Sequence, residues 1–274
     1  MKKRFLVPID FTDVTENALQ HAKAAALSLD ADLVLLHLVE AESERSKAEE
    51  HLQEWANRYT ENGWTIEPIV RKGNIDDIGP AAAEYGCGLI FMGTHGLRGM
   101  QYLLGSRALR VVSGSAVPFV VTHGGHPRIQ YRNIVVPMDM QIEEKQVLTA
   151  VAAVAKAMRA QVHLLGADYS DPFLKNKVTH SVAFARNYLR NQGVAFTIQR
   201  TEPDAGILES VLEFATDIDA DLIAIINHHE DGIKNLIGGG FDQKLITNEA
   251  HIPVLVVNSK RVDSHVDIFS MFAS

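Results

Sequence analysis

The stretch GTHGLRGMQYLLGS, residues 93–106, places four glycines, a histidine and a serine directly after the apolar run LIFM. Glycine lets the backbone approach a ligand closely and turn at positive φ, and we expect both at Gly93 and Gly96. Gly105 and Ser106 open a predicted helix, whose free N–H groups and dipole favour a phosphate. The stretch indicates a phosphate-binding loop. A glycine-rich turn that only packs tightly is the alternative.

Catalytic chemistry is less well supported by the same residues. Ser106, His95 and Asp10 include the types of a hydrolytic triad, but no G-x-S-x-G motif accompanies them. The chain also has no Walker motif with its lysine and no obvious acid pair for Mg²⁺. We therefore predict no catalytic residues and leave slow ATP hydrolysis open. Arg107 directly follows Ser106 and could contact a phosphate or face solvent.

A second group of polar residues, NHHED at 227–231, contains two histidines and two acids. Such residues can bind a metal, but tetrahedral sites usually draw their ligands from separated segments. A solvated polar loop is the favoured interpretation, and no metal site is predicted.

Composition limits the classes of partner. The chain has 274 residues and a net charge of −8, which argues against broad binding to nucleic acids or membrane surfaces. Its one cysteine, Cys87, excludes a disulfide within the chain and favours a reducing compartment. The N-terminal segment MKKRFLVPIDF contains too few apolar residues for a signal peptide. No apolar segment of the chain reaches the roughly 18 residues of a membrane helix. We expect a cytoplasmic protein.

The chain also repeats itself. Landmarks of its first half recur in the same order in its second half, which indicates a duplication. Residues 123–130, HGGHPRIQ, read as the linker. We predict domains at 1–124 and 131–260 and a tail at 261–274. The matched segments are 3–11 with 132–140, 31–40 with 160–169, 88–106 with 221–239, and 117–121 with 252–257.

Each copy alternates apolar strands with helices, which predicts a parallel, doubly wound sheet of five strands. In copy one, Asp13 and Glu16 resemble a capping box at a helix start. The helix at 43–61 presents Leu52, Trp55, Ala56 and Tyr59 on one face. Because proline cannot donate a backbone hydrogen bond, Pro68 predicts that the strand at 64–72 lies at a sheet edge. The remaining predicted elements are strands near 4–9, 32–39, 88–92 and 118–122 and helices near 76–85 and from about 106.

GTHGLRGMQYLLGS, with VPIDF before it and VPFVV after it, resembles the universal stress protein family in its tandem, two-domain form. The resemblance covers about 1–122 and 132–258. It implies two flavodoxin-like, Rossmann-like α/β domains and, in ATP-binding members, a site for the adenine, ribose and phosphates. Carried onto this sequence, the predicted nucleotide-binding residues of the first domain are Pro8, Ile9, Asp10, Val39, Gly93, Gly96, Gly105, Ser106 and Arg107.

The family pattern has nine residues between the second glycine and the Gly-Ser pair, whereas residues 97–104 number eight here. The choice among ATP, ADP and AMP, with or without Mg²⁺, therefore stays open.

The second copy departs further from the pattern. Gly93 corresponds to Ile226, Gly96 to His229 and Ser106 to Gly239, while Asp168 stands at the place of Val39. Asp139 keeps the place of Asp10, and Gly232 and Gly238 keep those of Gly99 and Gly105. Larger side chains and an added acid disfavour close approach and phosphate, so we predict that this domain binds no nucleotide.

These observations predict a binding and signalling protein whose first domain holds an adenine nucleotide. A nucleotide-independent scaffold is the alternative, and a slow ATP hydrolase is the third possibility. The resemblance further implies that VPFVV pairs with IPVLVV between the two domains. A homodimer is left open. The apolar tail residues Ile268, Phe269, Met271 and Phe272 could cover the second domain's sheet edge or mediate dimerisation.

Overall fold

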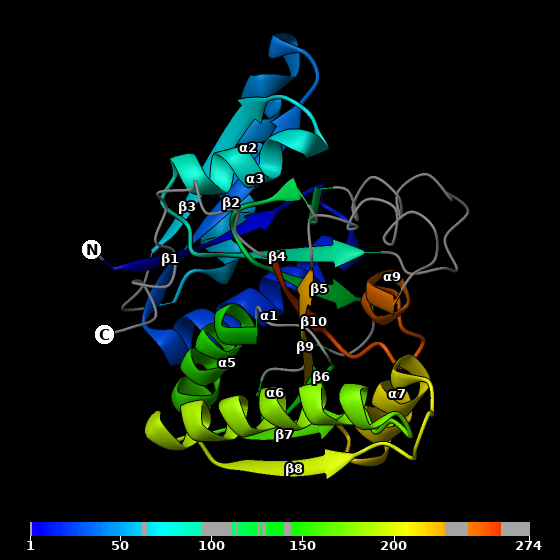
Figure 1. Cartoon of the computed structure of the whole chain (residues 1–274). Coiled ribbons are helices and arrows are strands. Elements are labelled where there is room, and N and C mark those ends of the chain that lie inside the picture. The colour runs from blue at the N-terminus through cyan, green and yellow to red at the C-terminus, as the bar shows by residue number, and fades with distance from the viewer. Residues whose placement is uncertain are drawn as a thin grey trace. The chain divides into compact units, whose positions relative to one another are not determined.

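The computed structural model describes residues 2–61, 65–94, 111–112, 114–124, 127, 130–139, 144–227 and 241–258. The chain divides into two compact units, Met1–Ile129 and Gln130–Ser274 (Figure 1).

The first unit contains five parallel strands in the order β3-β2-β1-β4-β5, which confirms the predicted doubly wound sheet. The connections run from β1 outward to β3 and then return past β1 to β4, so the strand order reverses between β1 and β4. The elements are β1 (Lys3–Pro8), α1 (Asp13–Leu29), β2 (Ala31–Val39), η1 (Glu42–Glu44), α2 (Arg45–Tyr59), β3 (Ile66–Lys72), η2 (Ile75–Asp77), α3 (Ile78–Glu84), β4 (Leu89–Thr94) and β5 (Phe119–His123).

Apolar strands fill the centre of this sheet because helices cover both of its faces. Phe5, Leu6 and Val7 of β1 are almost completely buried, and so are Leu33 to Leu36 of β2. The third strand lies at the edge of the unit's sheet, as Pro68 predicted.

The helices α1 and α2 lie on the same face of the sheet, where the Tyr59 hydroxyl donates to Glu16. All four residues predicted on the inner face of α2 are buried. The predicted capping box is wrong. Thr12 is the N-cap, Asp13 already belongs to the first turn, and Glu16 is engaged by Tyr59 instead. The Thr12 side chain makes no capping hydrogen bond, and its hydroxyl donates to Asp10.

The second unit repeats this strand order as β8-β7-β6-β9-β10, again with parallel neighbours. Figure 1 shows α5 and α6 side by side, and Thr149 and Tyr188 join them through hydroxyl oxygens 3.0 Å apart. The elements are β6 (Asn133–Met138), α5 (Glu144–Met158), β7 (Gln161–Gly166), α6 (Pro172–Asn191), β8 (Phe196–Arg200), α7 (Ile207–Asp217), β9 (Leu222–Asn227), α9 (Phe241–Ile246) and β10 (Val254–Asn258).

Among the helices of the described ranges, none combines the length and the apolar character that a bilayer crossing requires. Cys87 is a buried thiol whose pKa is raised to about 12, chiefly by burial, so it stays protonated and unreactive near neutral pH.

Candidate functional site

The carboxyl ends of β1 and β4 form the place where strand order reverses in the first unit. In open α/β sheets, ligands bind beyond the carboxyl ends of the strands at such a point. Asp10 follows β1 closely, and Gly93 and Thr94 are the last residues of β4. The fold therefore places the predicted aspartate and the first predicted glycine on the two strands that flank this point.

Asp10 is exposed, and its carboxylate is held by three hydrogen bonds. Its Oδ1 accepts from the Thr12 N–H at 3.1 Å, the Thr12 hydroxyl at 2.6 Å and the Thr15 hydroxyl at 3.0 Å. Within the described ranges, no hydrogen bond reaches Oδ2. The carboxylate is therefore fixed by one oxygen and can accept from an external donor with the other.

The backbone before Asp10 is equally constrained. Pro8 ends β1, and the buried Ile9 donates its N–H to the Leu36 carbonyl at 2.8 Å. The Ile9 carbonyl lies 2.7 Å from Nδ1 of His37, and since a carbonyl only accepts, that ring nitrogen carries the proton. Both backbone groups of Ile9 are thus bonded to β2, which fixes the point at which Asp10 leaves the sheet.

Phe11 is the residue at this turn that sequence reasoning missed. Its φ of 65° lies in the left-handed region, which costs an ordinary side chain roughly 1 kcal/mol. The conformation sends its ring against α2, where it stacks on His51 with centroids 3.9 Å apart and meets the edge of Trp55 at 5.6 Å. No residue type in the sequence signals a left-handed phenylalanine. The Phe11 ring thus both packs against α2 and shapes the turn.

Val39 is the last residue of β2 and is 3% exposed. Its carbonyl accepts from the Gly73 N–H at 3.0 Å, which fixes the end of β2 against the end of β3. Because β2 neighbours β1, this apolar residue lies at the same sheet edge as Asp10. An apolar residue beside a carboxylate fits a ligand with a flat ring and hydroxyl groups.

Gly93 serves a different purpose from the one predicted. It belongs to β4, and the glycines with positive φ in the described ranges are Gly86 and Gly193. A Cβ on Gly93 would lie 2.4 Å from the Val14 carbonyl oxygen and 2.7 Å from its Cγ1. The expected turn at positive φ is therefore wrong for Gly93, which is glycine because α1 packs directly against the end of β4.

Four predicted residues of the phosphate loop lie outside the described residues, namely Gly96, Gly105, Ser106 and Arg107. His95 and the eight-residue segment 97–104 lie outside them as well. The structure thus brings Pro8, Ile9, Asp10, Val39 and Gly93 to one edge of the sheet.

The equivalent edge of the second unit is occupied by its own side chains. The Tyr169 hydroxyl donates to Oδ1 of Asp139, the counterpart of Asp10, at 2.9 Å. Burial, followed by this hydrogen bond, raises the pKa of Tyr169 to about 12. Asp139 therefore already has a hydroxyl donor from within the chain.

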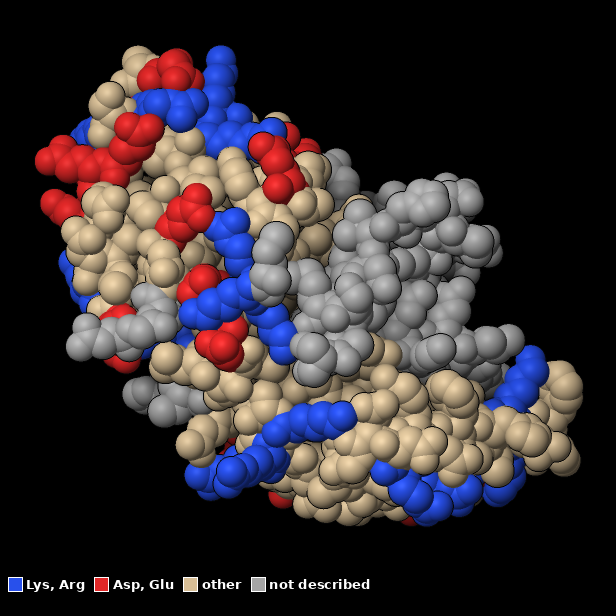
Figure 2. Space-filling model, turned by 90° about the vertical axis from the view of Figure 1, so that its left-hand side faces the viewer, with Lys and Arg blue, Asp and Glu red and all other residues tan. Residues whose placement is uncertain are grey.

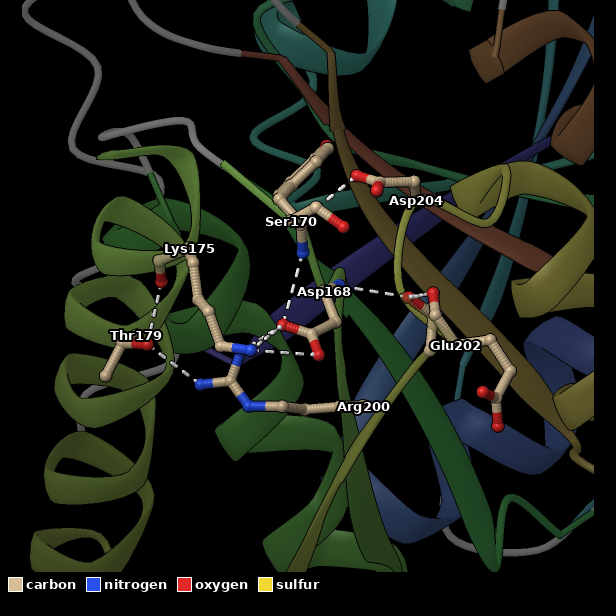
Figure 3. Close-up of polar contacts among 9 residues, drawn as sticks. Asp168, Ser170, Lys175, Thr179, Arg200, Glu202 and Asp204 are labelled. Atoms are coloured by element: carbon tan, nitrogen blue, oxygen red, sulfur yellow. Dashed lines mark hydrogen bonds and ion pairs between the residues drawn. The ribbon is translucent and has the colours of Figure 1, made fainter. Parts of the chain in front are cut away.

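Asp168, at the place of Val39, forms the centre of an ionic group (Figure 3). Lys175 of α6 lies 3.0 Å from its Oδ1, and Arg200 of β8 lies 4.0 Å from the same atom. The hydrogen bond from Lys175 lowers the pKa of Asp168, with partial burial opposing it. A charged, paired carboxylate thus replaces the apolar surface that Val39 supplies in the first unit.

Backbone contacts tie this edge together. The Asp168 carbonyl accepts from the Asp204 N–H at 2.9 Å, and the Asp204 carboxylate accepts from the Ser170 N–H at 3.0 Å. Figure 3 shows Asp204 and Ser170 facing each other beside Asp168. The segment after β7 is consequently bonded to the segment after β8 without any ligand.

The remaining predicted features of the second unit are only partly described. Ile226, the counterpart of Gly93, belongs to β9. His228 to Asp231 of the NHHED group lie outside the described residues. In the ranges that are described, no three residues of His, Cys, Asp or Glu type gather as metal ligands.

Comparison with known proteins shows what the first unit is similar to. Residues 1–123 match the profile of the Universal stress protein family. The matched residues make up most of the first unit and less than half of the chain. A universal stress protein of Methanocaldococcus jannaschii is 26% identical over 153 residues, which is 44% of this chain and 94% of that protein.

One solved universal stress protein shares the fold. This protein, from Archaeoglobus fulgidus DSM 4304, aligns with a TM-score of 0.76 at 18% identity, covering 93% of this chain and 98% of that one. Another from Archaeoglobus fulgidus, solved in complex with dAMP, aligns with a TM-score of 0.38 at 18% identity over 46% of this chain and 98% of that one.

Proposed function

We propose that the first unit is a universal stress protein domain that binds one adenine nucleotide and that the protein acts in signalling or regulation. The observation that supports the proposal most is Asp10, whose Oδ1 is held by Thr12 and Thr15 while Oδ2 has no described partner. A carboxylate that is fixed in place but has a free oxygen suits the hydroxyl groups of a ribose. Val39 would contact the base from the next strand.

The phosphates are assigned by the sequence pattern to Gly96, Gly105 and Ser106, with Arg107 beside them. Any Mg²⁺ would be held mainly by the phosphates, since Mg²⁺ usually keeps several waters and few protein ligands. We propose binding without efficient turnover, because the chain lacks a Walker lysine. An ATP pool that persists for hours in the presence of the protein would agree with this proposal, and stoichiometric release of phosphate in repeated cycles would contradict it.

The second unit, in this proposal, binds no nucleotide and acts as a structural or regulatory partner. Tyr169 donates to the carboxylate that would meet a ribose, and Asp168 adds charge where a base would lie. Removing either contact to admit a ligand would leave a partly buried polar group without its partner, which costs roughly 1–3 kcal/mol.

One observation favours the alternative of a nucleotide-independent scaffold. Gly93 is explained by the packing of α1, so this glycine is needed whether or not a nucleotide binds. Together with the eight-residue segment 97–104, it weakens the case that the glycine pattern alone requires a ligand.

Native mass spectrometry of the untagged chain, as purified and after addition of ATP with Mg²⁺, tests the proposal. We expect one adenine nucleotide per chain. No bound nucleotide, confirmed by titration calorimetry with ATP, ADP and AMP on folded protein, would overturn it in favour of the scaffold. Two nucleotides per chain would overturn the assignment of the second unit.

A pair of variants at Val39 tests whether the nucleotide binds at the predicted site of the first unit. Val39→Asp introduces the residue of the second unit and should abolish binding, whereas Val39→Ile keeps an apolar surface and should retain it. Circular dichroism and thermal unfolding show whether both variants fold. Equal affinity in the two folded variants would remove Val39 from the site.

A further inference from the structure

Among the described residues, none pairs with the outer side of the β8 backbone. This strand lies at the end of the strand order of its unit and, in the described ranges, pairs only with β7. Ile198 is 39% exposed, and Gln199 and Arg200 are exposed as well. A strand edge of this kind is a template for another strand, and most proteins block such edges.

Hydrogen bonds at both ends of β8 show which backbone groups face outward. The Val162 N–H donates to the Ala195 carbonyl at 2.9 Å, and the Thr201 N–H donates to the Gly166 carbonyl at 3.0 Å. Because backbone groups alternate in direction along a parallel strand, Thr197 and Gln199 also face β7. The N–H and carbonyl groups of Phe196, Ile198 and Arg200 therefore point away from the sheet.

In the first unit, a proline blocks strand pairing at the equivalent edge. The Leu33 N–H of β2 donates to the carbonyl of Thr65, just before β3, and the N–H of Gly73, just after β3, donates to the Val39 carbonyl. Pro68 therefore lies at an outward-facing position. Proline has no N–H and blocks pairing there.

Register shows that Pro68 and Ile198 occupy equivalent positions in the two units. Pro68 pairs with Leu35 and Ile198 pairs with Leu164, and the repeat offset of 129 residues carries Leu35 onto Leu164. The unit with the proline has a closed edge, and the unit with the isoleucine has an open one.

A basic helix lies beside this open edge. Although the chain carries a net charge of −8, α6 contains Lys175, Lys177, Arg186 and Arg190 and no Asp or Glu. In Figure 2, Lys and Arg dominate over Asp and Glu in the lowest part of the view, where α6 and β8 lie.

One flank of α6 faces β8. The Arg200 guanidinium donates to the Thr179 hydroxyl at 2.9 Å, which fixes that side of the helix. Arg186 and Arg190 follow Thr179 by about two and three turns on the same side, and both are exposed. Ile198 shares its sheet face with Arg200, since side chains two residues apart in a strand point the same way.

We propose that β8 is a docking site for an extended, acidic segment of a partner protein, which adds to the sheet as a further strand. The outward backbone groups of Phe196, Ile198 and Arg200 would pair with the segment. Its side chains on the α6 face would place carboxylates near Arg186 and Arg190 and an apolar group against Ile198. Backbone pairing supplies the affinity and the basic flank selects acidic sequences.

The test uses the full chain and a labelled peptide of about ten residues in which Glu alternates with Val. Fluorescence anisotropy should show binding that weakens with salt, and a matched Lys–Val peptide should bind at least roughly tenfold more weakly. Ile198→Pro copies the first unit and should reduce affinity roughly tenfold or more, while Ile198→Ala keeps the N–H and should retain most of it.

If Ile198→Pro fails to fold, amide hydrogen exchange on the wild-type chain tests the same proposal without the variant. In the wild-type chain, the Glu–Val peptide should protect the amides of Ile198 and Arg200. Absence of that protection, or equal binding to the folded proline and alanine variants, would overturn the proposal. So would a chain that dimerises without peptide and loses its dimer in Ile198→Pro, because the edge would then be occupied by a second copy.

Discussion

The carbonyl oxygen of Val14 lies where a side chain on Gly93 would begin, 2.4 Å from the Cβ position. The start of α1 and the end of β4 are therefore in direct backbone contact at the sheet edge that carries Asp10. This contact makes Gly93 a requirement of the fold, and its presence alone does not indicate a ligand.

Gly93→Ala should destabilise the first unit by about 2 kcal/mol or more, because a backbone carbonyl cannot move aside as a flexible side chain can. Thermal and urea unfolding measure the loss. Gly114→Ala is the matched control, since a Cβ there meets no atom within 4 Å, and it should change stability by less than about 0.5 kcal/mol. Equal stability of the two variants would contradict the packing explanation.

Asp10→Asn should weaken nucleotide binding roughly tenfold with little change in stability. The amide oxygen can still accept from Thr12 and Thr15, but an NH₂ group replaces the free carboxylate oxygen. Calorimetry with AMP, ADP and ATP measures the effect. Asp139→Asn changes the equivalent residue of the second unit and should leave the affinity unchanged. An equal loss in both variants would place the nucleotide elsewhere.

Phe11→Ala should destabilise the chain by about 1–3 kcal/mol, because the half-buried ring loses its contacts with His51 and Trp55 while alanine still has to adopt a positive φ. Phe173→Ala is the control, since that ring is 66% exposed, and its effect should stay within about 0.5 kcal/mol. Chemical denaturation compares the two. A loss no larger than the control's would show that the aromatic contacts contribute little.

We predict that the free energy of unfolding falls at alkaline pH because of Tyr169. Its pKa rises from 10.0 to about 12 in the folded chain, so the unfolded chain releases this proton at lower pH than the folded chain does. The stabilisation is complete below about pH 10 and declines as pH rises toward 12. Unfolding experiments across this range should show a shallower decline in Tyr169→Phe than in the wild type. Parallel declines would mean that burial and the Asp139 contact do not hold the proton on Tyr169 in the folded chain.

We predict that the free energy of unfolding also falls at acidic pH because of Asp168. Its pKa is lowered, chiefly by Lys175, so its contribution is complete above about pH 4 and is lost as pH falls through the lower, folded value. In Lys175→Met, the acid decline should be shallower because the main cause of the shift is gone. Thermal unfolding from pH 6 downward, at low salt, compares the variants. A steeper decline in Lys175→Met would contradict the assignment.

The fold could be predicted from the sequence because the patterns that indicate each strand and helix lie within single short segments. The strands β1 and β2 are continuous apolar runs, the inner face of α2 has helical spacing, and Pro68 marks an edge. Asp10 and Val39 were predicted from the family resemblance. They lie at one edge because parallel strands bring their carboxyl ends together whatever lies between them.

The features that were missed depend on contacts between distant residues. The role of Gly93 depends on Val14, and the bond between Tyr169 and Asp139 joins segments that follow different strands. The left-handed Phe11 is maintained by contacts with His37 of β2 and with His51 and Trp55 of α2. The capping box was wrong because the N-cap is Thr12, one residue before Asp13, and because Glu16 accepts a hydrogen bond from the distant Tyr59.

The hydrogen bond from Tyr169 to Asp139 has a consequence for how the chain responds to its surroundings. A ligand stabilises only the folded species to which it binds, in proportion to the logarithm of its concentration. Under the proposed function, the stability of the first unit would therefore rise with the concentration of its nucleotide, whereas that of the second unit would not change.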